Sequence, residues 1–495
     1  MALYLGIDLG TSGLKAVFID EAGTIVASGY RGYGIDIPQP GYAEQDPQVW
    51  WASLCAAVRE ALKSGAVAPR AVAGIGFSGQ MHSTVLLDAN ARVLRPAILW
   101  CDQRATGEAR RIRESVGAER LGRWVQNTVH TGFQASTLCW VRKWEPALFK
   151  QARHALLPKD YLRLRMTGEI GTDATDAAST LLFDCAHFCW SAPLLDALDI
   201  APSILPARVG MPSDVAGFLT AEAAAETGLC AGTPVVFGGG DQPMQAVGNG
   251  IFHPGTASLT LGTGGQILLP MESARYDPLL RTHTFCHALP GRWYAMGATL
   301  SACLSLNWFL DRVLSGPDLA LANEEAARVA PGSDGLVFLP YLTGERTPHM
   351  DPLARGAFFG LQLSHSRATM IRAVLEGVAY SLRDALDVLT QLNLGVERIV
   401  LAGGGVKSAL WVQILADVLE RPLYATRMRE EASVGAAICA MVGTGAYPTL
   451  AQACSRIVRL EERPVLPCDA NLCVYRDRLH TFRTLYTRTS DLNHT

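Results

Sequence analysis

Hydrophobic and polar positions alternate along the first thirty residues and predict a sheet at the start of the chain. Residues 3–9, 14–20 and 24–30 are rich in β-branched, aromatic and aliphatic side chains, and glycine-containing turns separate them. Short connections of this kind join antiparallel strands, so we expect a three-stranded meander. Asp46 at a cap position and Pro47 in the first turn then predict a helix with one apolar face toward this sheet. That face consists of Trp51, Leu54, Val58 and Leu62.

The same order of elements returns in the second half of the chain. Residues 256–270 repeat the strand, the glycine and threonine turn and the second strand of residues 4–20. An internal repeat indicates two related lobes, and we expect an α/β protein with lobes at residues 1–249 and 250–495. The other expected elements are strands at 71–79, 234–240, 396–405 and 421–428, a hairpin at 83–100, helices over 106–150, and helices at 368–390, 408–419, 432–443 and 476–492.

The composition describes a chain without a strong electrostatic field. It has 495 residues and a formal net charge of -3, from 43 Lys and Arg against 46 Asp and Glu. A nucleic-acid backbone needs a broad basic surface, so we expect no nucleic-acid partner. No apolar run approaches the roughly 18 residues that span a bilayer, and the N-terminus lacks a basic signal region, which predicts a cytoplasmic protein without a membrane partner. The 12 cysteines lie mostly in apolar segments and are expected to be reduced.

The turn at residues 8–13 (DLGTSG) has the residues needed to bind phosphate. Asp8 ends the strand before it, and Thr11 and Ser12 lie within it. Glycine lets backbone N–H groups approach an anion, and the two hydroxyl groups add donors. Asp8 is suited to hold Mg²⁺ through water, because this ion keeps much of its hydration shell. For a single turn of this type, an ordinary hairpin connection is the favoured interpretation.

A second copy of the turn and a third glycine cluster favour a nucleotide site over hairpin connections. Residues 260–265 (TLGTGG) present Gly262 and Thr263 from the second lobe. Two such turns on two lobes can hold one triphosphate between them. Gly404 and Gly405 end a further strand and open a helix, where backbone N–H groups can accept a nucleotide.

Other motifs fail on their context. Residues 74–79 match G-x-G-x-x-G, but a strand-like segment follows where a dinucleotide site has a helix. The chain contains neither the G-x-x-x-x-G-K-[ST] loop of common nucleotide-binding proteins nor the G-x-S-x-G turn of serine hydrolases. Cys185, His187 and Cys189 lack a second pair at zinc-site spacing, so we predict no structural metal there.

The glycine turns belong to stretches that together resemble the FGGY family of carbohydrate kinases over nearly the whole chain. These stretches include GIDLGTSGLK, EQDPQVWW, GQMHSTVLLD, LLPKDYLRLRMTGE, FLPYLTGERTPH and GAFFGL. The resemblance implies a two-domain actin-like ATPase fold of the ribonuclease H-like class, with duplicated lobes around a central cleft. It also implies transfer of the γ-phosphate of ATP, with Mg²⁺, to the C5 hydroxyl of the sugar D-xylulose. Ribulose, gluconate or another polyol is the alternative substrate.

The resemblance assigns roles to four residues on the sugar side. Asp241, which follows Gly238–Gly240, matches the catalytic aspartate, and a carboxylate that accepts a hydroxyl proton contributes about 100-fold to 10,000-fold. Asp241 is also placed to cap a helix that begins after it, a role compatible with catalysis. Met81 and His82 match the sugar-contacting pair, although such residues usually pack in a core. Gln242 is expected to bond sugar hydroxyls, in a place where xylulose-specific members often have asparagine.

Three further positions depart from the family pattern. Thr137 replaces a usual lysine, Thr369 an acidic or amide residue, and Gly264 a frequent serine. None of these changes removes a phosphate turn, so we expect the chemistry to persist. Asp102 and Arg104 are expected either to pair with each other or to line the sugar pocket.

Two functions other than sugar phosphorylation are compatible with a two-lobed fold of this type. An actin-like or chaperone ATPase with a protein partner would turn over nucleotide whether or not sugar is present. A sugar sensor would bind its ligand without forming a phosphosugar. The ATPase alternative does not account for the QMHS segment or for the acid after FGGG. The resemblance alone makes a homodimer the expected assembly.

Overall fold

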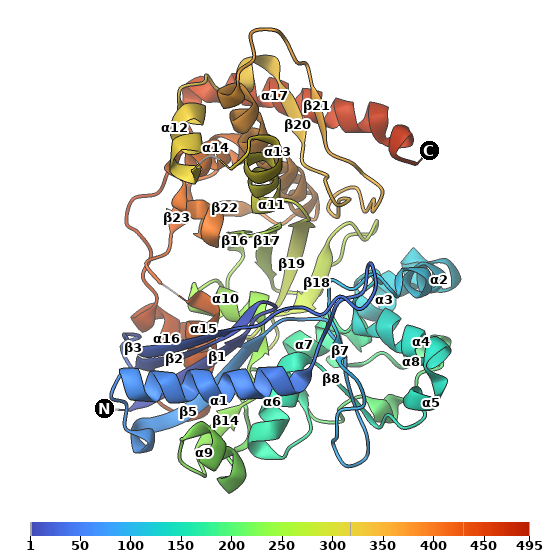
Figure 1. Ribbon diagram of the computed structural model, residues 1–495, viewed down its shortest axis with the longest axis vertical. Helices are drawn as coiled ribbons and strands as arrows, with labels where there is room; N and C mark the ends of the chain where they lie inside the picture. The colour runs from blue at the N-terminus through green and yellow to red at the C-terminus, as the bar shows by residue number, and fades with distance from the viewer. Residues whose placement is uncertain (1, 317, 429, 495) are drawn as a thin grey trace.

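The computed structural model describes residues 2–316, 318–428 and 430–494 and has two lobes, each built around a sheet (Figure 1). The first half of the chain, blue to green, forms the lower lobe, and most of the second half forms the upper lobe. Within the described ranges, every helix is too short or too polar to span a bilayer.

The strands of the first half run from β1 to β15. They are β1 (Leu3–Leu9), β2 (Gly13–Asp20), β3 (Ile25–Gly32), β4 (Glu44–Gln45), β5 (Val72–Gly79), β6 (Val85–Leu87), β7 (Ala97–Ile98), β8 (His154–Leu156), β9 (Thr172–Asp173), β10 (Phe183–Asp184), β11 (Cys189–Trp190), β12 (Val209–Gly210), β13 (Val215–Phe218), β14 (Pro234–Val236) and β15 (Gly239–Gly240). The second half contributes β16 (Gly255–Leu261), β17 (Gly265–Met271), β18 (His283–Cys286), β19 (Trp293–Thr299), β20 (Val337–Leu339), β21 (Ala357–Phe359), β22 (Val396–Ala402) and β23 (Leu423–Ala425).

The helices of the first half are α1 (Pro47–Ser64), α2 (Thr106–Val116), α3 (Ala118–Val125), α4 (Gln134–Trp144), α5 (Pro146–Phe149), α6 (Pro158–Thr167), α7 (Ala174–Ser179), α8 (Ala192–Leu198), α9 (Ala221–Thr227) and α10 (Asp241–Gly248). The second half contributes α11 (Cys303–Trp308), α12 (Leu319–Ala327), α13 (Arg367–Gln391), α14 (Ala409–Leu419), α15 (Glu431–Gly443), α16 (Leu450–Ile457) and α17 (Asp469–Thr489). The helices predicted over 106–150 and the four predicted in the second half are confirmed.

The two main sheets share one plan, which confirms the repeat predicted from the sequence. The first has the order β13-β14-β5-β1-β2-β3, with β15 beside β5, and the second has the order β18-β19-β17-β16-β22-β23. In the first sheet β1 pairs antiparallel with β2 and parallel with β5. In the second sheet β16 pairs antiparallel with β17 and parallel with β22. Each lobe therefore has a glycine turn at the end of its first strand, beside the end of a parallel neighbour.

Alternate residues of β1 face two different helices. Leu5 and Ile7 belong to the core formed with α1, whereas Tyr4 belongs to the core formed with α15. The predicted helix start is confirmed, because the Asp46 carboxylate accepts a hydrogen bond from the N–H of Gln48 at 2.9 Å. This cap fixes the entry of α1 onto the sheet.

Helix α15 comes from the second half of the chain but packs against the first sheet (Figure 1). A Cβ on Gly6 would lie 1.8 Å from the carbonyl oxygen of Ser433, and a Cβ on Gly76 would lie 1.9 Å from that of Ala436. Only glycine permits so close an approach of helix and strand. The predicted division at residue 249 does not describe this contact, because small residues rather than hydrophobic periodicity decide where α15 lies.

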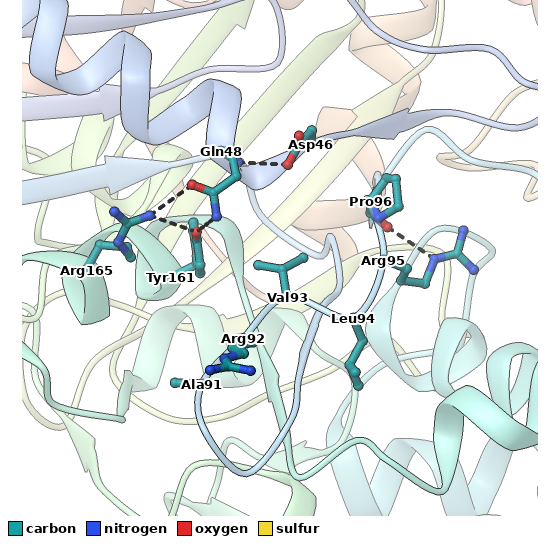
Figure 2. Close-up of a pocket in the computed structure, with 10 residues that line it drawn as sticks. All are labelled: Asp46, Gln48, Ala91, Arg92, Val93, Leu94, Arg95, Pro96, Tyr161 and Arg165. Carbon is teal, nitrogen blue, oxygen red and sulfur yellow. Dashed lines mark hydrogen bonds between the residues drawn. The ribbon is translucent and has the colours of Figure 1, made fainter.

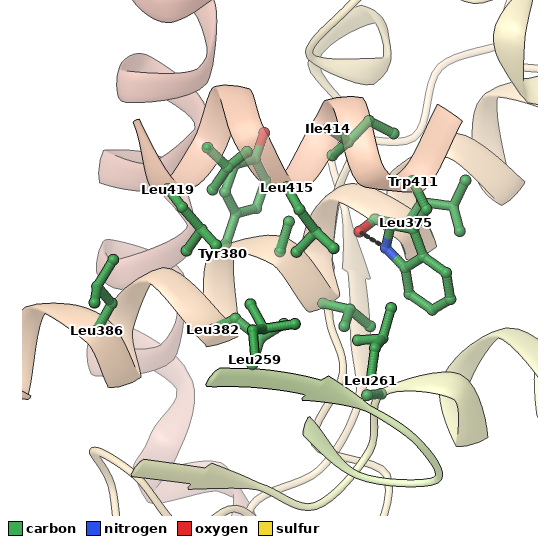
Figure 3. Close-up of a cluster of buried hydrophobic side chains, with 14 of the residues drawn as sticks. Leu259, Leu261, Leu375, Tyr380, Leu382, Leu386, Trp411, Ile414, Leu415 and Leu419 are labelled. Atoms are coloured by element: carbon green, nitrogen blue, oxygen red, sulfur yellow. Dashed lines mark hydrogen bonds between the residues drawn. The ribbon is translucent and has the colours of Figure 1, made fainter. Parts of the chain in front are cut away.

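The core of the second lobe holds the end of β16 in place (Figure 3). Leu259 and Leu261 of β16 lie under α13 and α14, against leucine side chains of both helices. The indole N–H of Trp411 donates to the carbonyl oxygen of Leu375 at 3.0 Å and ties the two helices together. This packing anchors the strand directly before Gly262.

The hairpin predicted at 83–100 is confirmed. Its turn closes with a hydrogen bond from the N–H of Asp88 to the carbonyl oxygen of Arg92 at 3.0 Å, and Thr84 and Ile98 exchange two backbone hydrogen bonds, at 2.9 Å and 3.1 Å. Each arm also has a partner distant in sequence, because β6 pairs with β8 and β7 pairs with β4. Distant partners therefore extend the local pairing.

Candidate active site

The first sheet brings Asp8 and Asp241 to one edge. Asp8 stands opposite Ser78 in the parallel pair β1–β5, and Gly239 stands opposite Ser78 in the parallel pair β5–β15. Asp241 follows two residues later, where α10 begins. Both acids therefore lie at the carboxyl ends of parallel strands, where open α/β sheets bind their ligands.

The glycines before Asp241 are required by what surrounds them. Gly238 has a φ of +70°, and a Cβ at this position would lie 2.2 Å from the carbonyl oxygen of Phe77 in β5. Both the backbone conformation and the space exclude other residues. The chain can therefore turn sharply against β5 and deliver Asp241 to the sheet edge.

The next two glycines leave room for side chains of the site. A Cβ on Gly239 would lie 2.9 Å from Oγ1 of Thr175, and a Cβ on Gly240 would lie 2.6 Å from Cγ of Met81. Met81 is buried against this segment. The predicted sugar-side residue Met81 and the predicted base thus belong to one packed unit.

The electrostatics of Asp241 suit a proton acceptor. Burial, followed by the negative charge of Asp8, raises the pKa of Asp241 from 3.8 to about 7. Burial also raises the pKa of Asp8, while the hydroxyl of Ser78, which donates to Oδ1 at 2.7 Å, and the charge of Lys15 oppose this rise. A carboxylate with a pKa near neutrality can both accept a proton and release it again.

The prediction that Asp241 caps the following helix is wrong by one position. Gly240 is the cap residue, with extended backbone angles, and Asp241 is the first residue of α10. Its Oδ1 accepts a hydrogen bond from the N–H of Gln242 at 2.7 Å. The carboxylate still lies in the first turn of the helix, where the helix dipole favours negative charge.

The first glycine turn is held by its carbonyl groups. The hydroxyl of Tyr33 donates to the carbonyl oxygen of Gly10 at 2.7 Å, and the side-chain amide of Gln45 donates to that of Thr11 at 2.7 Å. No described residue accepts from the N–H of Thr11 or Ser12. These two donors and the exposed Ser12 hydroxyl are therefore available to an anion.

The second turn repeats this arrangement. The carbonyl oxygen of Gly262 accepts from the N–H of Cys303 at 2.9 Å, and that of Thr263 accepts from the N–H of Ala302 at 2.9 Å. The N–H groups of Thr263 and Gly264 donate to no described residue. This turn thus also presents backbone donors, with the Thr263 side chain exposed.

The third glycine cluster lies beside the second turn. Thr260 of β16 stands opposite Ala402 at the end of the parallel strand β22. A Cβ on Gly405 would lie 2.5 Å from Cδ2 of Leu261, so glycine is needed for this close approach. A Cβ on Gly404 would meet no atom within 4 Å, and its α-carbon faces open space.

A hydrogen bond joins the end of β16 to the helix that carries Asp241. Oγ1 of Thr260 donates to Oε1 of Gln245 at 2.6 Å. Gln245 lies four residues after Asp241 on α10, and residues at this spacing share one helix face. The structure therefore brings the second turn to the same side of α10 as the predicted base.

His82 is a neutral acceptor next to Met81. Its Nδ1 lies 2.8 Å from the carbonyl oxygen of Ser179, and a carbonyl can only accept, so Nδ1 carries the proton and Nε2 is an acceptor. Burial lowers the pKa of His82 to about 3, and the positive charge of Arg346 acts in the same direction. His82 has a φ of +74° and lies in the turn that follows β5.

Sequence reasoning missed several side chains around this histidine. Phe133 stacks on His82 with ring centroids 3.7 Å apart, and Arg346 of the second lobe lies 5.8 Å from the Phe133 centroid. Trp100 is exposed and its indole N–H donates to Oγ1 of Thr11 at 3.0 Å. Phe133, Trp100 and Arg346 lie in segments that resemble the family, but the resemblance assigns no role to them. No local sequence pattern distinguishes them from their neighbours.

Asp102 and Arg104 form the predicted ion pair. The guanidinium of Arg104 contacts the Asp102 carboxylate at 2.8 Å and Glu44 at 2.7 Å. Both members of the pair are buried, and the N–H of Ala43 donates to Asp102 at 2.6 Å. The pair therefore ties the start of the β4 segment to the loop after β7.

A cavity of about 560 Å³ lies away from these residues, between the start of α1, the segment before β7 and α6 (Figure 2). Its polar side chains bond one another: Arg165 donates to Gln48 at 3.0 Å, and Gln48 donates to Tyr161 at 3.0 Å. None of the predicted site residues lines it. The candidate site is therefore the sheet edge between the lobes, and this cavity is separate from it.

Comparisons with known proteins decide the family. The N-terminal domain of the FGGY family of carbohydrate kinases matches residues 3–248, and the C-terminal domain of that family matches residues 257–444. The chain belongs to the FGGY family of carbohydrate kinases. The two-domain actin-like fold and the sugar kinase activity expected from the resemblance are thereby confirmed.

Several relatives of this FGGY kinase carry one name. The xylulose kinase of Escherichia coli (strain K12) is 39% identical, over 98% of this chain and 98% of that protein. The xylulose kinase of Klebsiella pneumoniae is 43% identical, over 84% of each chain. The crystal structure of xylulose kinase from Rhodospirillum rubrum matches with a TM-score of 0.91 at 32% identity and covers 100% of both chains.

The structure accounts for two of the departures from the usual FGGY pattern. A Cβ on Gly264 would lie 2.5 Å from the carbonyl oxygen of Thr299, so serine at this position would require the turn to shift. Thr369 completes a capping box with Ser366 at the start of α13, which is a local structural role. Thr137 is fully buried in α4, and nothing in the structure explains the replacement of lysine there.

Proposed function

We propose that this protein is an ATP-dependent kinase that phosphorylates the C5 hydroxyl of D-xylulose. Relatives named xylulose kinase that align with nearly the whole chain support this substrate. The observation that carries the proposal is that Asp241, with a pKa of about 7, shares a sheet edge with the glycine turn after Asp8. A proton acceptor and a phosphate-binding surface are the two parts that transfer from a nucleotide to an alcohol requires.

On the sugar side, Asp241 accepts the proton of the C5 hydroxyl as the sugar oxygen bonds to the γ-phosphorus and the bond from that phosphorus to the ADP oxygen breaks. The Nε2 atom of His82 accepts from a second sugar hydroxyl. No described residue bonds the side-chain amide of Gln242, so it is available for a further hydroxyl. Met81 packs beside Gly240 and forms the apolar wall of this pocket.

On the nucleotide side, the two turns hold the phosphates and the third glycine cluster borders adenosine. The residues are Thr11, Ser12, Gly262, Thr263, Gly404 and Gly405. Asp8 would hold Mg²⁺, because a single half-buried carboxylate fits an ion that takes few protein ligands. The described residues contain no cluster of three or more His, Cys, Asp or Glu side chains that would hold a metal without water or substrate. When bound, Mg²⁺ neutralises phosphate charge.

Closure of the lobes on both substrates excludes water from Asp241. A base that activates a sugar hydroxyl would activate water equally well, and an open cleft would then hydrolyse ATP. The hydrogen bond between Gln245 and Thr260 already joins the two halves next to Asp241. We also propose a cytoplasmic homodimer, for which the family resemblance is the support.

A panel of sugars tests the proposal. Purified protein with MgATP is given D-xylulose, D-ribulose, D-gluconate or glycerol, ADP release is followed, and the product is identified by mass spectrometry and phosphorus NMR. We expect the highest kcat/KM with D-xylulose and a product phosphorylated on C5. Preference for ribulose or gluconate would identify a sister kinase. ADP release indifferent to sugar would identify an ATPase, and sugar binding without a phosphosugar would identify a sensor.

A further inference from the structure

We infer that Thr175, anchored by a buried ion cluster around Lys159, positions the catalytic carboxylate of Asp241. Thr175 touches neither substrate nor nucleotide in this assignment and acts through the peptide before the base. The inference rests on the role of Asp241 proposed above.

The hydrogen bonds of Thr175 have a fixed direction. Its Oγ1 lies 2.6 Å from Oδ2 of Asp173 and 3.0 Å from the backbone nitrogen of Gly240. A carboxylate oxygen can only accept, so the hydroxyl proton is donated to Asp173. The oxygen lone pair then accepts from the Gly240 N–H. The negative charge of Asp173 thus strengthens the bond that holds the residue before Asp241.

Asp173 is itself held by a cluster that water does not reach. Nζ of Lys159 lies 2.8 Å from Asp173, 2.7 Å from Asp160 and 3.1 Å from Asp176. Burial by itself lowers the pKa of Lys159, but the three carboxylates raise it above its ordinary value, so the amine is charged. Burial raises the pKa of Asp176 well above 3.8. Arg163 joins the cluster through Asp160, at 3.3 Å.

A fully buried ion cluster of this kind is a rigid anchor. All five side chains, those of Lys159, Asp160, Arg163, Asp173 and Asp176, have 0% exposure. Removing one partner would leave a buried charge without compensation, and that cost opposes any rearrangement. The position of Thr175 is therefore set by groups on α6, β9 and α7, far from β15 in the sequence.

The hydrogen bond between Thr175 and Gly240 sets the orientation of the Asp241 carboxylate, because it holds the peptide directly before Asp241. Gly240 is the cap residue of α10, and Asp241 is the next residue. A Cβ on Gly239 would lie 2.9 Å from Oγ1 of Thr175, so glycine at this position leaves room for the threonine. A shift of the Gly240 peptide moves the start of α10 and hence the carboxylate. Displacement of a catalytic group by about 1 Å costs on the order of 100-fold in rate.

Two substitutions at Thr175 test the inference. Thr175→Val keeps the shape and removes the hydroxyl, and we expect kcat at saturating sugar to fall by about 10-fold to 100-fold with KM for ATP unchanged. Thr175→Ser keeps the hydroxyl, and we expect a kcat within about twofold of the parent. The matched control is Thr227→Val in α9, a fully buried threonine whose hydroxyl, like that of Thr175, donates to one oxygen and accepts from one backbone N–H, here the carbonyl oxygen of Ala223 at 2.7 Å and the N–H of Leu229 at 3.4 Å. We expect this control to keep kcat.

A double-mutant cycle separates this inference from the proposed function. If Thr175 acts through Asp241, Thr175→Val changes the residual single-turnover rate of Asp241→Asn by less than about twofold. A further 10-fold loss in that background would overturn the inference, as would parental kcat in folded Thr175→Val. If the valine variant does not fold, a 10-fold loss in Thr175→Ser overturns it instead. Parental activity of Asp241→Asn alone contradicts the proposed function, whatever Thr175 does.

Discussion

Asp241→Asn removes the proposed proton acceptor while keeping the local structure. Asparagine has the shape of aspartate, and its Oδ1 can still accept from the N–H of Gln242 as the carboxylate does at 2.7 Å. The amide cannot take up the proton of a sugar hydroxyl. We therefore expect kcat to fall by about 100-fold to 10,000-fold, with ATP binding retained.

The same substitution should make the fold more stable at high pH. Burial disfavours the charged form, so the folded pKa of about 7 lies above the unfolded value, and ionising Asp241 costs folding free energy. The cost is absent below about pH 4, grows between about pH 4 and pH 7, and is complete above pH 7. The pKa difference limits the gain in the free energy of unfolding to about 4 kcal/mol. Because water reaches the half-buried carboxylate, we expect a gain of roughly 1–2 kcal/mol.

Two measurements check this prediction together. Steady-state ADP release with D-xylulose gives kcat, and urea unfolding at pH 5 and pH 8 gives the free energy of unfolding of both proteins. We expect a less active variant whose advantage in stability is larger at pH 8 than at pH 5. The control Asp88→Asn, in an exposed turn, should keep kcat and gain no stability. Near-parental kcat in Asp241→Asn would refute the catalytic assignment, and lower stability at pH 8 would refute the electrostatic one.

Three other predictions follow from the same geometry. Asp8→Asn removes a charge that raises the pKa of Asp241, so the acid limb of the pH profile of kcat/KM should move below pH 7. The variant should also need more Mg²⁺ for half-maximal rate. An unmoved acid limb would contradict the electrostatic effect of Asp8 on Asp241. Gly238→Ala should destabilise the fold by about 2–4 kcal/mol in urea unfolding, because its Cβ would meet the backbone of Phe77. The control is Gly232→Ala, expected to cost about 1 kcal/mol, since Gly232 has a φ of +83° but a Cβ there would meet no atom within 4 Å. Equal losses would contradict the contact argument. Gly404→Ala should leave stability unchanged and raise KM for ATP about threefold to tenfold, since its Cβ enters the space assigned to nucleotide; an unchanged KM would place the nucleotide elsewhere.

Local sequence patterns predicted most helices and the plan of the two sheets. The cap at Asp46 and the apolar face after it specify α1 by short-range interactions, and the structure has that helix with its cap bond. The repeated strand and turn at residues 256–270 specify a second copy of the first sheet for the same reason. The hairpin at 83–100 was predicted as well, but the pairing of its arms with β8 and β4 was not, because those partners are distant in sequence.

The site was predictable where its chemistry lies in one continuous stretch. The turns after Asp8 and Leu261 show their glycines and hydroxyls directly, and the resemblance to FGGY kinases adds Asp241. Thr175 and Arg346 have no such signal. Each reaches the site from an element far away in the chain, and each residue type is common on any helix or loop.

By itself, the sequence determined the repeated lobes, the glycine turns and the acid that follows three glycines, since these depend on backbone freedom and on neighbours within a few residues. Only the tertiary structure decided that α15 crosses to the first sheet, that Thr260 bonds Gln245 beside Asp241, and that a buried lysine cluster holds Thr175 against Gly240. These contacts depend on close approach between separate segments. Thr260 and Gln245 are 15 residues apart, whereas the partners in the other two contacts are more than 60 residues apart. Burial then does what no linear pattern encodes: it partly desolvates the Asp241 carboxylate and raises its pKa to about 7.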